Sequence, residues 1–179
     1  MSDIKAIDTF YRGILYRSRL EARWAVFFHK LNLKFEYEAE GYQLPSGWYL
    51  PDFFIHDWDC FIEIKPKGRL EPDAVVKGFE LQQESGKRII ILVGNPYPRD
   101  HVGLMYPGDA LVTGGEFLCC SHCESGIALV SPGCLLTLKD NGCFNLPAAR
   151  YIITSKLREA YMAARTARFE HGAQEDANG

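Results

Sequence analysis

Two short apolar segments separated by a polar turn constrain this chain more than any other feature. Phe53–Ile55 and Cys60–Ile62 have the apolar and aromatic composition of strands. Asp57 and Trp58 lie between them, where the chain can reverse its direction. We therefore expect a hairpin in which the first segment pairs with the second. This pairing decides which of the flanking charged residues come together.

Three charged residues flank the expected hairpin on one face of its sheet. The register places Asp52 directly opposite Glu63, and directly opposed residues have Cβ atoms about 5 Å apart. Lys65 lies two residues beyond Glu63 and therefore projects from the same face. Two carboxylates confined to one patch reduce stability unless a positive charge lies between them. A divalent cation with oxygen ligands, Mg²⁺ or Mn²⁺, would supply that charge.

The pattern Pro51-Asp52, followed after ten intervening residues by Glu63-Ile64-Lys65, resembles the active site of the PD-(D/E)XK nuclease superfamily, which has the restriction-endonuclease-like fold. The resemblance implies that Asp52 and Glu63 hold Mg²⁺, helped by the backbone carbonyl of Ile64. It also implies that Lys65 positions or activates the attacking water and steadies the charge on the phosphate. Phosphodiester hydrolysis itself requires a metal and a nearby cation. The structural alternative is a surface hairpin with ordinary solvated charges.

A helix is expected upstream, over residues 16–31. Its apolar residues follow helical spacing and form a buried stripe, and Glu21 lies at the edge of that stripe. Many members of the superfamily carry a glutamate of the first helix beside the metal, and Glu21 matches it. Ser18 and Glu21 also form a capping-box pattern, which is a sufficient structural reason for this glutamate. The two roles are compatible, because a capping residue can also support a metal site.

The expected element order matches the common core of the superfamily. A strand over 35–42 follows the first helix, then come the two hairpin strands, a helix over 72–83 capped by Asp73, and a buried strand over 88–94. The order α-β-β-β-α-β predicts an α/β fold with a nuclease core over residues 1–95. A β-rich, cysteine-rich insertion over 96–147, a C-terminal helix over 148–171 and a disordered tail over 172–179 complete the expected organisation.

Five of the six cysteines crowd into one stretch of the expected insertion. Clustered cysteines in an intracellular chain favour a metal over disulfides. The sequence thus allows structural Zn²⁺, with Cys119 or His122 able to replace one ligand. The alternative is that these cysteines are buried as small apolar residues, as we expect for Cys60. The preferred zinc ligands are Cys120, Cys123, Cys134 and Cys143.

The charge distribution is compatible with a nucleic-acid partner, although the net charge is only −3. The first 35 residues carry seven Lys and Arg against three acids, whereas residues 36–65 carry seven acids and Lys65 alone as a base. Basic ends around an acidic centre suit a nuclease, but solvated helices show similar charges. The candidate phosphate contacts are Arg17, Arg19, Arg23 and Lys67.

These observations predict a cytoplasmic, metal-dependent DNA endonuclease, and the resemblance to the superfamily implies a bacterial or phage source. No apolar run reaches the ~20 residues of a membrane span. The small size favours structure-directed cutting, such as nicking, branch resolution or repair, over sequence-specific restriction. A non-catalytic nucleic-acid-binding zinc module and a phosphoesterase for small molecules are the rival functions. A homodimer would suit paired cuts across a duplex, and the sequence leaves the oligomeric state open.

Overall fold

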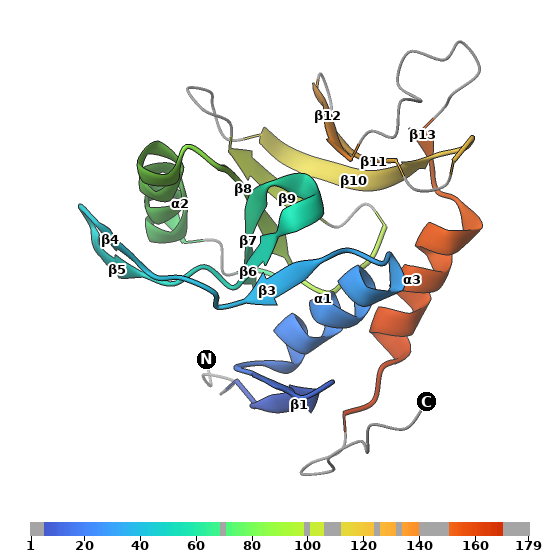
Figure 1. Cartoon of the computed structure of the whole chain (residues 1–179), viewed down its shortest axis with the longest axis horizontal. Helices are drawn as coiled ribbons and strands as arrows, with labels where there is room; N and C mark the ends of the chain where they lie inside the picture. The colour runs from blue at the N-terminus through green and yellow to red at the C-terminus, as the bar shows by residue number, and fades with distance from the viewer. Residues whose placement is uncertain are drawn as a thin grey trace.

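The computed structural model describes residues 6–68, 71–98, 101–105, 112–123, 126–131, 134–139 and 151–169. Within these ranges the fold is mixed α/β, with a large sheet, two small hairpins and three α-helices (Figure 1). The helices are α1 (Arg19–Lys30), α2 (Pro72–Ser85) and α3 (Ser155–Thr166), and a short 3₁₀ helix, η1, spans His56–Trp58.

The large sheet has the strand order β12-β11-β10-β9-β8-β7-β6-β3, with β13 paired to β10. Only β7 and β8 are parallel among the pairs of the described strands, and α2 connects them. The sheet strands are β3 (Phe35–Tyr37), β6 (Phe53–Ile55), β7 (Cys60–Lys65), β8 (Arg88–Val93), β9 (His101–Met105), β10 (Val112–Cys120), β11 (Ile127–Ser131), β12 (Cys134–Lys139) and β13 (Tyr151–Ile152).

The expected hairpin is confirmed in its register. Phe53 pairs with Ile62, Phe54 with Phe61, and Ile55 with Cys60. The connection is η1 rather than a simple turn at Asp57-Trp58, and it ends at Asp59 in the left-handed conformation with φ 47°. Asp and Asn tolerate this conformation better than other side chains. When only the strands of the large sheet and the helices are counted, the order from α1 to β8 is α1-β3-β6-β7-α2-β8. This is the α-β-β-β-α-β order expected from the sequence.

Two small hairpins were not expected. One joins β1 (Thr9–Tyr11) to β2 (Ile14–Tyr16), and the other joins β4 (Tyr42–Leu44) to β5 (Gly47–Tyr49). The strand expected over 35–42 is therefore wrong beyond Tyr37, because Glu38 has φ 48° and interrupts the extended backbone.

The helix ends differ from the expectation in several places. The first helix begins at Arg19 rather than at residue 16, because Tyr16 belongs to β2 and Ser18 is the N-cap. Glu71 occupies the N-cap of α2, so Asp73 lies in the first turn and is not the cap. The C-terminal helix is shorter than 148–171, because Thr154 caps α3 by accepting a hydrogen bond from the Leu157 amide. β13 precedes it in the extended conformation. The expected cap of α1 is confirmed, since the Ser18 hydroxyl accepts from the Glu21 amide.

A single core joins the first half of the chain to the strands that follow residue 95. The antiparallel pairing of β8 with β9 continues the sheet across this point. Phe117 of β10 is fully buried, and its ring centroid lies 5.8 Å from that of Phe27 on α1 and 5.4 Å from that of Trp58. Tyr161 of α3 packs on the same Phe27 at 4.7 Å. The expected boundary at residue 95 thus falls between two strands that are hydrogen-bonded to each other.

The three α-helices are 12 to 14 residues long. Over the ranges described above, no helix has both the length and the apolar character that crossing a membrane requires.

Replacing Phe117 with alanine should destabilise the whole fold. Removal of a fully buried phenylalanine costs about 3–5 kcal/mol, and the shared core predicts one cooperative loss of structure. Urea unfolding followed by tryptophan fluorescence and by far-ultraviolet circular dichroism measures the effect. Phe79→Ala is the matched control, because Phe79 is 45% exposed and should cost much less. Two separate transitions, with only one moved by Phe117→Ala, would contradict a shared core.

Candidate active site

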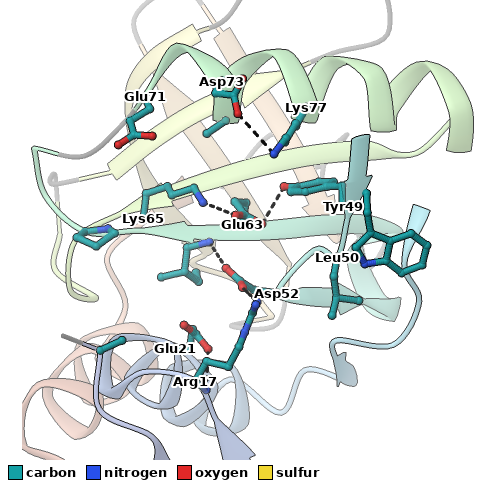
Figure 2. A pocket seen from close by; sticks show the side chains of 15 residues that line it. Arg17, Glu21, Tyr49, Leu50, Asp52, Glu63, Lys65, Glu71, Asp73 and Lys77 are labelled. Carbon is teal, nitrogen blue, oxygen red and sulfur yellow. Dashed lines mark hydrogen bonds and ion pairs between the residues drawn. The ribbon is translucent and has the colours of Figure 1, made fainter. Parts of the chain in front are cut away.

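A cavity of about 720 Å³ lies beside the C-terminal end of β7 (Figure 2). Five parts of the chain line it: Ala6, the start of α1 with the segment just before it, the end of the β4–β5 hairpin with the segment that follows, the end of β7, and the first turns of α2. All four residues predicted to be catalytic, Glu21, Asp52, Glu63 and Lys65, are among the residues that line it. Ile64 lines it as well.

Asp52 is held by two donors from opposite sides. One carboxylate oxygen accepts a hydrogen bond from the Ile64 amide at 2.7 Å, and the other accepts from the Arg17 guanidinium at 3.0 Å. The residue is only 4% exposed. The Ile64 amide is available because the sheet pairing of β6 with β7 ends at Phe53 and Ile62. Asp52 is therefore fixed by the backbone of the strand that carries Glu63.

Glu63 is also buried, at 5% exposure, and its two oxygens have different partners. One accepts a hydrogen bond from the Tyr49 hydroxyl at 2.8 Å, and the other pairs with the Lys65 ammonium at 2.5 Å. Figure 2 shows Tyr49 and Lys65 approaching Glu63 from different directions. The pKa of Tyr49 is raised by burial and by the nearby charge of Glu63, so its hydroxyl remains a donor at neutral pH.

Glu21 serves the helix and the site together. One of its oxygens accepts from the Ser18 hydroxyl at 2.6 Å, and the other accepts from the Tyr37 hydroxyl at 2.5 Å and the Arg17 amide at 3.1 Å. This is a variant of the capping box, in which the glutamate reaches the amide one residue before the cap. The negative charge of Glu21 also acts on Asp52. One conformation of Glu21 therefore satisfies both expectations, that it caps the helix and that it lies near the other carboxylates.

The clustered charges move the pKa values of Asp52 and Lys65. Burial raises the pKa of Asp52 well above its ordinary value, and the charges of Glu63 and Glu21 raise it further. The Ile64 amide and Arg17 act in the opposite direction without cancelling the rise. For Lys65, burial alone would lower the pKa, but the charge and hydrogen bond of Glu63 outweigh it and the pKa is raised. Lys65 is thus a cation at neutral pH.

The carboxylate oxygens of this site are of the type that binds a hard divalent cation, although they already have partners within the protein. Among the described residues, no three His, Cys, Asp or Glu side chains stand ready to hold one metal ion. Protein donors occupy the carboxylates of Asp52 and Glu63, and two of these donors, Arg17 and Lys65, are cations. Buried carboxylates that repel one another are nevertheless the oxygen ligands that Mg²⁺ takes. Asp52 and Glu63, with Glu21 and the Ile64 carbonyl, remain the predicted ligands.

The predicted phosphate contacts do not all lie at the cavity. Arg17 lines it, with its side chain 56% exposed, and also pairs with Glu38. Arg23 instead donates to the side chain of Asn95 at 2.8 Å, and neither it nor Arg19 nor Lys67 is among the lining residues. A role of Arg19, Arg23 and Lys67 in binding nucleic acid stays a prediction.

Part of the expected zinc site is described. The sulfur of Cys120 accepts a hydrogen bond from the His122 amide at 3.4 Å, and that of Cys123 accepts from the Gly126 amide at 3.3 Å. The side chain of Cys134 and all of Cys143 lie outside the described residues, so the four-ligand site stays a prediction. Cys119 is buried in the main core. The expected core position of Cys60 is confirmed, and burial raises the pKa of its thiol.

Several lining residues were missed from the sequence. They are Trp48, Tyr49, Leu50, Glu71, Asp73 and Lys77. A usable signal existed for the first three, because Pro45-Ser46-Gly47 is a turn pattern between two aromatic-rich segments and could have predicted the β4–β5 hairpin. Glu71, Asp73 and Lys77 come from α2, whose place beside β7 depends on the β7–α2–β8 crossover.

No protein-family model matches this sequence, and no curated protein matches it significantly.

Mg²⁺ should stabilise this protein more at pH 8 than at pH 6. The folded-state pKa of Asp52 is raised, so protonation of Asp52 favours the fold at low pH and this contribution is lost as the pH rises through that pKa. Mg²⁺ competes with the proton and restores stability at the higher pH. The gain is about 2.7 kcal/mol when the free ion is at 100 times its Kd. Thermal unfolding in Mg²⁺ and in EDTA at both pH values measures the difference.

Asp52→Ala should lose this Mg²⁺ effect together with its pH dependence. Asp59→Asn is the control, since Asp59 lies outside the cavity with its side chain 61% exposed and should keep the wild-type response. An equal gain from Mg²⁺ in Asp52→Ala would show that the ion binds elsewhere.

Proposed function

We propose that this chain is a metal-dependent nuclease of the PD-(D/E)XK type that hydrolyses phosphodiester bonds in DNA. One observation carries the proposal. Asp52, Glu63 and Lys65, recognised from their spacing alone, line one cavity in which both carboxylates are buried and the lysine is paired with Glu63. A solvated surface hairpin would leave these carboxylates exposed, so their burial argues against that alternative.

The arrangement of the main elements supports a restriction-endonuclease-like core. The order α1-β3-β6-β7-α2-β8 places the Asp52 and Glu63 motifs on adjacent strands, with β7 parallel to β8. The first helix contributes Glu21 to the lining of the same cavity. Strands β10, β11 and β12, of which β10 and β12 contain cysteines, extend the sheet beyond β9 and contribute no residue to the lining of the cavity.

The proposed ligands of Mg²⁺ or Mn²⁺ are Asp52 and Glu63, with Glu21 and the Ile64 carbonyl in support. A bound divalent cation would lower the pKa of the attacking water and offset charge on the phosphate oxygens. The protein prepares this chemistry by keeping Asp52 and Glu63 together despite their repulsion. The Ile64 amide fixes Asp52 and the Tyr49 hydroxyl fixes Glu63, so neither carboxylate has to be ordered when substrate arrives.

Lys65 acts as a cation and hydrogen-bond donor. Its raised pKa makes it a poor general base, because the ammonium holds its proton at neutral pH. It can donate to the attacking water or to a phosphate oxygen and so stabilise charge in the transition state. In the hydrolysis, the water oxygen bonds to phosphorus and the bond from phosphorus to the leaving sugar oxygen breaks. The water gives its proton to solvent, and the leaving oxygen takes one from solvent.

The cavity suits a polymeric substrate better than a small phosphate ester. Its rim is exposed, since the side chains of Arg17 and Asp73 are 56% and 72% exposed, so a strand can pass through it without being enclosed. Arg17, Lys65 and Lys77 give the lining three cations for phosphates. The small scaffold favours structure-directed cutting, with sequence-specific restriction and a non-catalytic binding module as the alternatives.

Cleavage assays with matched variants test the proposal. Labelled duplex, single-stranded, nicked and four-way-junction DNA are incubated with Mg²⁺ or Mn²⁺, with RNA strands in parallel. Wild type should cut at least one DNA, and Asp52→Asn and Lys65→Ala should each reduce the rate by at least ~100-fold, as expected for loss of a preorganised charge.

Asp59 and Lys87 provide a matched ion pair for control. They form a pair at 2.6 Å between exposed side chains outside the cavity. Asp59→Asn and Lys87→Ala should therefore retain wild-type rates. Binding without cutting, with every DNA and RNA left intact in both metals, would overturn the nuclease assignment and favour the binding module. Equal losses in both pairs of variants would show that the effect is general destabilisation.

A further inference from the structure

Trp48 is a large aromatic side chain that lines the cavity and is exposed to solvent. It is 64% exposed, whereas the other two tryptophans of the chain, Trp24 and Trp58, are 0% and 1% exposed. Leaving an indole in water forfeits the free energy that burial would give. The indole of Trp48 is thus a wide, flat, apolar group that remains exposed among the polar side chains of the cavity.

The indole is held in place by the hairpin that carries it. Trp48 of β5 is paired with Gln43 of β4, and Gly41 lies two residues before Gln43 on the same face. Diagonal neighbours of this kind are within reach of an aromatic ring. A Cβ atom at Gly41 would lie only 2.1 Å from the ring carbon Cζ2 of Trp48, so the ring packs against bare backbone that only glycine offers. One side of the ring is supported, and the side chain still keeps most of its surface in solvent.

The β4–β5 hairpin is held by hydrogen bonds to Glu63 and α2 and by packing against α2. Tyr49, the next residue after Trp48, donates to the buried carboxylate of Glu63 at 2.8 Å. The turn is tied to α2, because the Ser46 amide donates to Glu80 at 3.0 Å. Tyr49 and Leu44 also join the second core cluster with Leu81 of α2. The position of the indole relative to the carboxylates is thus set by contacts on both faces of the hairpin.

We propose that Trp48 stacks on an unpaired nucleobase of the strand that the cavity binds, so that the substrate is single-stranded at or beside the cut. This inference rests on the proposed nuclease function and names its substrate class. Every base has a flat face that stacks on aromatic rings, but in a duplex those faces are covered by neighbouring base pairs. A cavity of about 720 Å³ is within the range of sites for small ligands, which suits a nucleotide unit. The nearby cations Lys65, Lys77 and Arg17 suit its phosphates.

Quenching of tryptophan fluorescence tests the stacking directly, without reference to cleavage. Iodide in water reaches exposed indoles, so Trp48 should account for nearly all the quenching, given the burial of Trp24 and Trp58. Saturating single-stranded oligonucleotide, with Ca²⁺ in place of Mg²⁺ and its integrity checked on a gel, should reduce Trp48 emission and protect it from iodide. A blunt duplex of the same sequence should protect it much less.

Variants separate stacking from other uses of this surface. Trp48→Ala should weaken binding of the single strand by about 5- to 150-fold, the range of one base stacked on an aromatic ring, and change duplex binding less than twofold. Trp48→Tyr should retain most of the affinity. Gly41→Ala should weaken binding of the single strand while keeping the tryptophan, because the added methyl displaces the ring. Phe79→Ala removes an aromatic of 45% exposure outside the cavity and should change nothing.

The outcomes distinguish this inference from the proposed function. If wild type cuts DNA but Trp48→Ala binds and cuts single strands as well as wild type does, the stacking proposal is wrong and the nuclease stands. If single strands protect Trp48 but no nucleic acid is cut, stacking stands and catalysis fails. Protection of Trp48 by rising protein concentration alone, with no effect of DNA, would assign the indole to a contact between copies of the chain and overturn the proposal.

Discussion

The burial of two neighbouring carboxylates, Asp52 and Glu63, is the constraint on which the rest of the site depends. Each is 5% exposed or less, and their charges repel across the end of the β6–β7 pairing. An ionised carboxylate removed from water destabilises a fold unless donors or cations compensate it. Here the compensation comes from outside the hairpin as well as from it. Arg17 reaches Asp52 from the start of α1, and Tyr49 reaches Glu63 from β5.

These partners explain why small elements surround the large sheet. The β4–β5 hairpin places Tyr49 against Glu63, and its other contacts, with α2, hold it there. Tyr37 of β3 donates to Glu21 and accepts from the Arg17 amide, so it links β3 to the segment that supplies both Arg17 and Glu21. The aromatic core beneath α1 fixes this helix against the sheet. The geometry of a few polar atoms is therefore determined by packing across the whole described fold.

The parts of this arrangement that the sequence predicted are those with short-range causes. The register of the hairpin follows from the short polar connection between Phe53–Ile55 and Cys60–Ile62, because the length of the connection decides which residues face each other. The Ser18–Glu21 cap is likewise local. The end of β3 at Glu38 and the pairing of Arg17 with Asp52 are different, since a left-handed glutamate and a contact across 35 residues leave no periodic trace. Tyr49 lies in a three-residue strand that is too short to show a period, so the turn pattern at Pro45-Ser46-Gly47 was the sequence signal for its hairpin.

The cations of the site have a consequence for how it would work. Arg17 and Lys65 offset the carboxylate charge in the protein alone, and each is bonded to one of the predicted metal ligands. A divalent cation at Asp52 and Glu63 would take over that compensation, because its two positive charges equal those of Arg17 and Lys65 together. Arg17, whose side chain is 56% exposed and also pairs with Glu38, would then no longer be needed at Asp52, so its pairing there and its predicted contact with nucleic acid are compatible. Under the proposed function, the same side chain would stabilise the fold before binding and contact a phosphate afterwards, since the two demands on it arise at different stages of binding.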